Sequence, residues 1–131
     1  MIGLDTNVLL RLLVRDDRAQ YETAARFVKE AVTQGEILFI DGIVVAELAW
    51  ALAQTYRRSR DEIATAIEQI LRTAEFEVEG STLAWAALHE YKQNNADFTD
   101  CLNGSLNRGV GCSATATFDR KAGKLESFKL L

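Results

Sequence analysis

The chain has 131 residues, of which 48% are hydrophobic and 26% are charged, and this size and balance predict a single domain spanning residues 1–131. No stretch approaches the ~20 consecutive apolar residues of a membrane-spanning helix, so we expect no membrane protein. With 15 basic and 19 acidic residues the net charge is −4, the wrong sign for a protein that holds nucleic acid by charge alone.

Apolar periodicity predicts a regular alternation of strands and helices in the first half of the chain. A short strand over residues 1–4 leads into a helix over residues 8–13. The pair Asp17 and Gln20 has the spacing of a capping box and predicts a second helix that ends near residue 35. Residues 37–40 suit a strand buried on both faces, and a strongly apolar, largely buried helix is expected over residues 43–56.

The second half continues this alternation. Ser59 and Glu62 form another capping-box pattern, with an apolar helical stripe that extends to residue 71. We then expect, in order, a short exposed strand at 76–78, a helix from residue 81 or 82 to 91, a helix from about 97 to 108, a strand within 113–118 and a last strand at 128–131. Strands separated by helices imply an α/β fold with a parallel sheet covered on both faces.

Several acidic residues fall where such a sheet binds ligands. Asp5 and Asp119 each follow a predicted strand, at the carboxyl end where ligands collect. Glu47 is the only charged residue between positions 42 and 53. Asp97 and Asp100 are three residues apart at a predicted helix start and therefore share one face.

Each acid also has a purely structural interpretation. Asp5 and Asp97 fit helix N-caps, and Asp119 fits an ordinary turn. Glu47 fits a salt bridge to Arg11 or Arg15. If the acids instead share one edge of the sheet, their mutual repulsion calls for a divalent cation.

The choice of metal follows from the other candidate ligands. Cys101, Cys112 and the single His89 are too few and too widely spaced for a zinc site or a disulfide framework. Oxygen ligands favour Mg²⁺, with Mn²⁺ as a substitute. No export signal is apparent near the N-terminus, so we expect a cytoplasmic protein in which the cysteines stay reduced.

Four blocks of this sequence, in this order, resemble the PIN-domain ribonucleases, and among them the VapC-type toxins of toxin–antitoxin pairs. The blocks are Ile2-Gly3-Leu4-Asp5-Thr6-Asn7-Val8-Leu9, Val44-Val45-Ala46-Glu47-Leu48, Ala96-Asp97-Phe98-Thr99-Asp100-Cys101-Leu102 and Thr115-Ala116-Thr117-Phe118-Asp119-Arg120-Lys121. The resemblance extends over nearly the whole chain and implies a PIN-like three-layer α/β/α sandwich with a central, mainly parallel sheet. The chain departs from the family pattern at Asn103-Gly104-Ser105, where apolar residues are more usual.

The resemblance also implies which residues act. Its acidic metal pocket corresponds to Asp5, Glu47, Asp100 and Asp119, with Asp97 as an additional metal neighbour. The implied substrate-positioning residues are Thr6, Asn7, Thr117, Arg120 and Lys121. The implied activity is Mg²⁺-dependent hydrolysis of RNA phosphodiester bonds, in a homodimer paired with a VapB-like antitoxin.

Two other functions are compatible with parts of the sequence. One is a metal-dependent phosphatase or phosphoacceptor domain, since Asp5 follows a first strand, although a phosphatase of the haloacid-dehalogenase type has a second aspartate where this chain has Asn7. The other is a domain of the same fold that binds RNA or protein without cutting it. Trp50 and Trp85 are expected in the core or at a dimer contact, and His89 on the surface.

Overall fold

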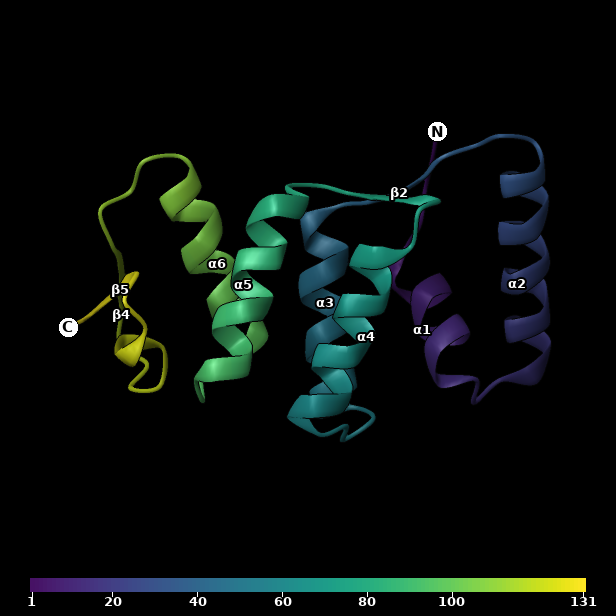
Figure 1. Cartoon of the computed structure of the whole chain (residues 1–131). Helices are drawn as coiled ribbons and strands as arrows, with labels where there is room; N and C mark the ends of the chain where they lie inside the picture. The colour runs from purple at the N-terminus through teal and green to yellow at the C-terminus, as the bar shows by residue number, and fades with distance from the viewer.

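The computed structural model describes all of residues 1–131 and has the predicted order of elements (Figure 1). The first half contains β1 (Ile2–Gly3), α1 (Thr6–Val14), α2 (Arg18–Thr33), β2 (Leu38–Ile40), α3 (Gly42–Gln54) and α4 (Arg60–Arg72). The second half contains β3 (Phe76–Val78), α5 (Ser81–Gln93), α6 (Phe98–Gly109), β4 (Thr115–Thr117), the 3-10 helix η1 (Ala122–Lys124) and β5 (Phe128–Leu130). The predicted α/β class is confirmed, and η1 is an addition within the turn that follows Asp119.

Short-range hydrogen bonds fix the starts of the helices. The Asp17 carboxylate accepts from the Gln20 main-chain N–H at 3.0 Å at the start of α2, as its spacing predicts. Ser59 and Glu62 form a complete reciprocal capping box at the start of α4. Asp41 caps α3 by accepting from the Val44 N–H at 2.9 Å. These bonds lie within four residues of each helix start, so a local sequence pattern is enough to predict them.

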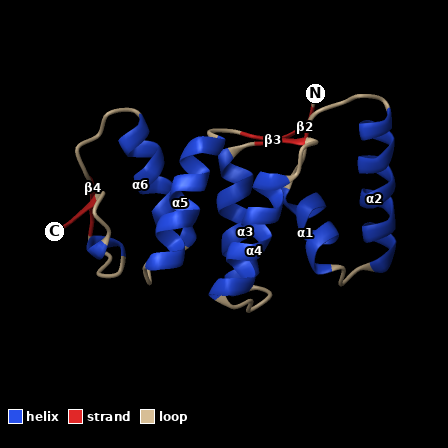
Figure 2. Cartoon of the chain, in the orientation of Figure 1, coloured by secondary structure: helices blue, strands red, loops and turns tan.

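Every strand pair is parallel, as expected, but the strands form two separate sheets. The first has the order β1–β2–β3 and the second pairs β4 with β5. The two sheets lie apart, with α5 and α6 between them in the view (Figure 2). β1 and β4 therefore each have only one neighbouring strand.

The core is one cluster of 25 buried residues, centred on β2, α3 and α4, with Leu38, Ile40, Leu48 and Ile67 almost completely enclosed. Two expectations need correction. β3 is not an exposed strand, because Val78 pairs in register with Ile40 and is buried.

None of the helices combines the length and apolar character needed to cross a membrane.

The second correction concerns α3, which is buried on one face only. Val45 and Leu48 pack into the core, whereas Ile43 is 70% exposed and Trp50 is 62% exposed. Ile43, Glu47 and Trp50 follow one another at helical spacing, so they form a single exposed stripe. Glu47 is therefore not a carboxylate on a largely buried helix.

Candidate active site

Asp5 and Glu47 are joined through Thr6. Asp5 lies between β1 and α1 at the N-cap position, yet its carboxylate accepts no capping hydrogen bond. The next residue, Thr6, is buried and donates its hydroxyl to Glu47 Oε2 at 2.9 Å. The end of the first strand is thereby tied to the middle of α3, and the Asp5 carboxylate remains exposed to solvent.

Glu47 has no salt bridge to the first helix. Arg11 instead pairs with Asp16 at 3.0 Å and donates to the Tyr56 hydroxyl at 3.3 Å. The hydrogen bond that Arg11 donates to the Tyr56 hydroxyl is the largest contribution to the raised pKa of Arg11. The structural alternative for Glu47, an ion pair to Arg11 or Arg15, is thus absent, and its only hydrogen-bond donor in the protein is Thr6.

A second group of acids surrounds the start of α6. Asp97 occupies the N-cap position without making a capping hydrogen bond, so the capping interpretation fails for it as it does for Asp5. Asp100 lies one turn later and is half-buried. Burial raises the pKa of Asp100 above its ordinary value, and the negative charges of Asp119 and Asp97 raise it further. Asp97, Asp100 and Asp119 therefore influence one another electrostatically.

Asp97 and Asp100 line a hollow of about 240 Å³ between α3 and α6. The exposed Trp50 and the hydroxyl-bearing Thr99 line the same hollow, and neither was predicted as a site residue. Trp50 is three positions after Glu47, so helical spacing alone places it beside that acid. Of the two places expected for Trp50, the core is wrong, because the α3 stripe faces outward, and the dimer contact stays a prediction.

Asp119 uses one carboxylate oxygen for an ordinary turn hydrogen bond and leaves the other without a hydrogen bond. Its Oδ1 accepts from the Ala122 N–H at 2.8 Å, which is the ordinary turn interaction, and its own N–H donates to Thr117 Oγ1 at 3.0 Å. Thr117 thus holds the turn that carries Asp119. Arg120 and Lys121 follow in the sequence, are exposed and form no ion pair.

The five acids do not converge on one point. No three carboxylate, histidine or cysteine side chains lie close enough together to hold a metal ion. One group contains Asp5 and Glu47, and the other contains Asp97, Asp100 and Asp119. Both groups adjoin the exposed stripe of α3, but the residues as arranged in this chain do not fit a metal ion.

None of the five acids forms an ion pair with a basic side chain. By contrast, Asp16, Glu22, Glu62 and Glu68 do, and Glu36 pairs with the N-terminal amino group of Met1. The charges of the five candidate acids are thus left without a basic partner in the protein, as are those of several other surface acids.

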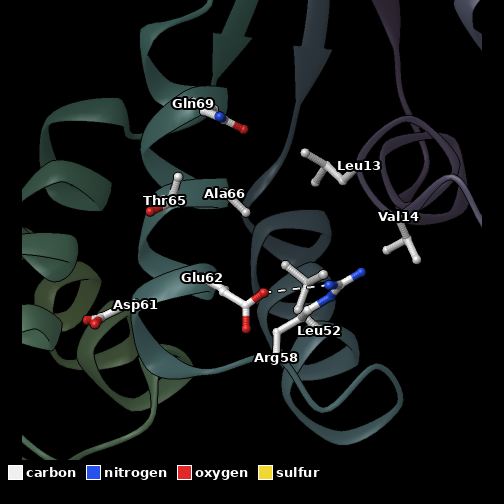
Figure 3. A pocket seen from close by; sticks show the side chains of 9 residues that line it. All are labelled: Leu13, Val14, Leu52, Arg58, Asp61, Glu62, Thr65, Ala66 and Gln69. Carbon is white, nitrogen blue, oxygen red and sulfur yellow. Dashed lines mark ion pairs between the residues drawn. The ribbon is translucent and has the colours of Figure 1, made fainter.

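Asn7 faces a different space. Together with Asp5 it lines a groove of about 560 Å³ between β1, α1 and α2. A further hollow lies between α1 and α4, where Arg58 and Glu62 form an ion pair at 3.6 Å across one end (Figure 3). None of the candidate acids lines that second hollow.

The remaining polar candidates behave as expected. His89 is exposed. Cys101 and Cys112 are both free, so the expectation that they do not pair is confirmed. Cys101 is fully enclosed directly behind Asp100, and burial raises the pKa of its thiol to about 12.

The sequence is similar to those of known proteins over nearly its whole length. The family model described as PIN domain matches residues 2–126. A curated VapC ribonuclease from Aquifex aeolicus (strain VF5) is 32% identical over 122 residues, which cover 93% of this chain and 90% of that protein.

Proposed function

The chain belongs to the PIN-domain family, and from this premise we propose that it is an endoribonuclease acting as the toxin of a toxin–antitoxin pair. The observation that carries the proposal is the acidic group at the start of α6, where the negative charges of Asp119 and Asp97 act on the half-buried Asp100 and no basic side chain pairs with any of the three. Carboxylates left uncompensated by the protein are suited to bind a cation or to accept a proton.

The proposed cofactor is Mg²⁺, with Mn²⁺ as a substitute, because carboxylate oxygens are the ligands these ions prefer. The resemblance to PIN-domain ribonucleases makes Asp5, Glu47, Asp100 and Asp119 the proposed ligands, with Asp97 nearby. The chain as folded here keeps these residues in two groups, so no step of the reaction is assigned to the ion.

We assign different roles to these side chains: proton transfer, contact with RNA phosphates, and positioning of the acids. Asp100 is the best candidate to accept a proton from the attacking water, because its raised pKa makes it a stronger base than an ordinary aspartate. Arg120 and Lys121 would contact RNA phosphates. Thr6 would hold Glu47 in place, and Thr117 would hold the Asp119 turn.

The proposed partners are an RNA substrate, a VapB-like antitoxin and a second copy of the chain, in the cytoplasm. The 32% identity to a VapC ribonuclease supports the first two. The exposed Trp50 and Ile43 support association with another protein surface.

The test is RNA cleavage by the purified protein freed of its antitoxin. Cleavage should require Mg²⁺ or Mn²⁺ and stop with EDTA. Asp5→Asn, Glu47→Gln, Asp100→Asn and Asp119→Asn should each reduce the rate by about 100-fold or more. Asp16→Asn is the matched control, since Asp16 is a surface acid that already has an ion-pair partner in Arg11.

Full cleavage by Asp5→Asn would contradict the proposal. Tight RNA binding without cleavage by the unaltered protein would indicate the non-cleaving alternative. Turnover of a chromogenic phosphate monoester, without RNA cleavage, would indicate the phosphatase.

A further inference from the structure

Arg60 lies where a basic side chain does not suit its own helix. It is the first residue of α4, and the start of a helix carries a partial positive charge that disfavours a cation. The next two residues, Asp61 and Glu62, are acidic and suit this position. Arg60 also forms no ion pair with an acidic side chain. Neither its own helix nor a surface ion pair therefore accounts for this residue.

The Arg60 guanidinium binds the end of another helix. Its Nη2 donates to the main-chain oxygens of Tyr91 and Asn94 at 2.8 Å each, and its Nη1 donates to the Asn95 oxygen at 3.4 Å. These residues lie where α5 ends, and the main-chain oxygens of a last helical turn have no partner within the helix. In Figure 1 the start of α4 and the end of α5 both lie at the lower side of the molecule. The cation thus caps the negative end of α5.

The same guanidinium stacks on an aromatic pair. Its carbon lies 3.9 Å from the centroid of the Tyr91 ring. The Tyr91 ring in turn meets the Phe98 ring edge to face, with the centroids 5.7 Å apart, and both side chains are almost completely buried. Phe98 is the first residue of α6. The stack of Arg60, Tyr91 and Phe98 therefore joins the start of α4, the end of α5 and the start of α6.

The segment held in this way leads to two of the candidate acids. Asn94 and Asn95 begin the connection between α5 and α6, and Asp97 ends it. Asp97 makes no capping hydrogen bond, so the start of α6 is not fixed by its own cap. Tyr91 lines the same hollow as Asp97 and Asp100. The main chain that carries these acids is thus fixed by contacts in which Arg60 takes part.

We infer that Arg60 is a positioning residue for the proposed nuclease: it holds the connection between α5 and α6 and thereby places Asp97 and Asp100. It acts through main-chain oxygens and the Tyr91 ring, because no ion pair joins it to either acid. The effect on cleavage rests on the proposed function, whereas the holding of the connection does not.

The chemistry of the guanidinium is specific to this role. A planar fork directs several N–H groups to separate oxygens while its face stacks on a ring. The ammonium group of lysine has the same charge but a single nitrogen, so it cannot reach these oxygens together or stack in this way. Arg60→Lys should therefore hold the connection less well than arginine and better than alanine.

Hydrogen exchange followed by mass spectrometry tests whether Arg60 holds the connection. In Arg60→Ala the amides of residues 94–102 should exchange about tenfold faster or more, because hydrogen bonds from a charged group are lost. The amides of β1, β2 and β3 should change little. Arg60→Lys should give an intermediate increase.

Ser59→Ala is the matched control for a weakened α4. It removes the hydroxyl that caps the same helix at the neighbouring position, and it should leave exchange at 94–102 unchanged. Unchanged exchange there in Arg60→Ala would overturn the inference, as would an equal increase in Ser59→Ala. If Arg60→Ala does not fold, Arg60→Lys decides, and exchange equal to that of the unaltered protein would then overturn it.

Steady-state cleavage of a short fluorogenic RNA tests the effect on the acids. Arg60→Ala should lower kcat by about tenfold or more, because misplaced acids act poorly on the reacting phosphate. KM should stay within about twofold, since the contacts with the rest of the RNA remain. Arg57→Ala is the control for a lost positive charge, because Arg57 is an exposed neighbour without an ion pair, and its kcat should be unchanged.

The possible outcomes separate the two claims. A raised KM with unchanged kcat in Arg60→Ala would mean that Arg60 contacts RNA, and it would overturn the positioning role. Unchanged kcat and KM with faster exchange would overturn the effect on cleavage alone. Unaltered protein that cuts no RNA would overturn the proposed function, while the exchange measurement would still decide whether Arg60 holds the connection.

Discussion

The Thr6 hydroxyl donates to Glu47 Oε2 across 2.9 Å and joins two elements that are 41 residues apart in the chain. It is the only hydrogen bond that the protein supplies to the Glu47 carboxylate. We therefore expect Thr6→Val, which keeps the shape and removes the donor, to reduce RNA cleavage by about tenfold through a misplaced carboxylate.

The same change should cost only about 1 kcal/mol of unfolding free energy, because one hydrogen bond to a largely exposed acid is lost. Cleavage assays and urea titrations measure the two effects. Thr6→Ser keeps the donor and is the matched control. Equal activity of the Val and Ser variants would show that Thr6 does not position Glu47.

Asp100 should make the protein less stable at neutral pH. Its pKa in the folded chain is raised, first by burial and then by Asp119 and Asp97, so near this pKa the folded state binds more protons than the unfolded state. Stability from this group is present below the ordinary pKa of 3.8 and is lost as the pH rises through the folded pKa. Asp100→Asn should therefore raise the Tm at pH 7 in EDTA.

This gain should vanish as the pH is lowered below 3.8, because both proteins are then neutral at this position. Thermal unfolding followed by circular dichroism at several pH values measures it. Asp119→Asn should give a change of the same sign, since it removes one of the charges that repel Asp100. A lower Tm for Asp100→Asn at neutral pH would be inconsistent with this account.

Ser59 should stabilise α4 through its capping box. Its hydroxyl accepts from the Glu62 N–H at 3.1 Å, and Glu62 returns a bond to the Ser59 N–H at 3.0 Å. The bond from the Ser59 main chain is also the largest cause of the lowered pKa of Glu62. Ser59→Ala should cost about 1 kcal/mol in chemical unfolding. Ser81→Ala is the control, because Ser81 begins α5 without capping it.

Gly104 allows the C-terminal strands to dock on α6. A Cβ at this position would lie 2.5 Å from Ser127 Oγ and 2.6 Å from the Phe128 ring. Gly104→Ala should destabilise the protein by about 1–2 kcal/mol, since crowding outweighs the better helix propensity of alanine. Asn103→Ala, at the exposed neighbouring position, should change the urea midpoint little. A stabilising effect of Gly104→Ala would show that the strands separate easily from α6.

The two thiols should differ in reactivity. Cys101 is fully enclosed and its pKa is raised to about 12, whereas Cys112 is exposed. Because the thiolate is the reactive form, iodoacetamide at pH 8 should label the native chain once, at Cys112. Intact-mass spectrometry should show a second label only in denaturant. Rapid labelling of Cys101 in the native protein would mean that α6 opens readily.

The helices and strands of this protein were predicted well from the sequence. The caps at Asp17 and Ser59 and the apolar periodicity place each element to within a few residues, because these signals act between neighbours along the chain. The order of strands and helices likewise gave the parallel α/β class. The same local reasoning failed for α3: its apolar composition predicted a largely buried helix, but the face that carries Glu47 is exposed.

The amino-acid sequence by itself determined which acids are present, that Asp5 and Asp119 follow strands, and that Asp97 and Asp100 lie at a helix start. The tertiary structure alone decided which acids pair with basic groups, that Thr6 holds Glu47, and that Asp5 and Asp119 lie apart in one chain. It also decided that β1 and β4 keep open edges. Local patterns specify hydrogen bonds within a few residues, whereas distances between remote segments depend on how the helices pack together and on which surfaces that packing leaves uncovered.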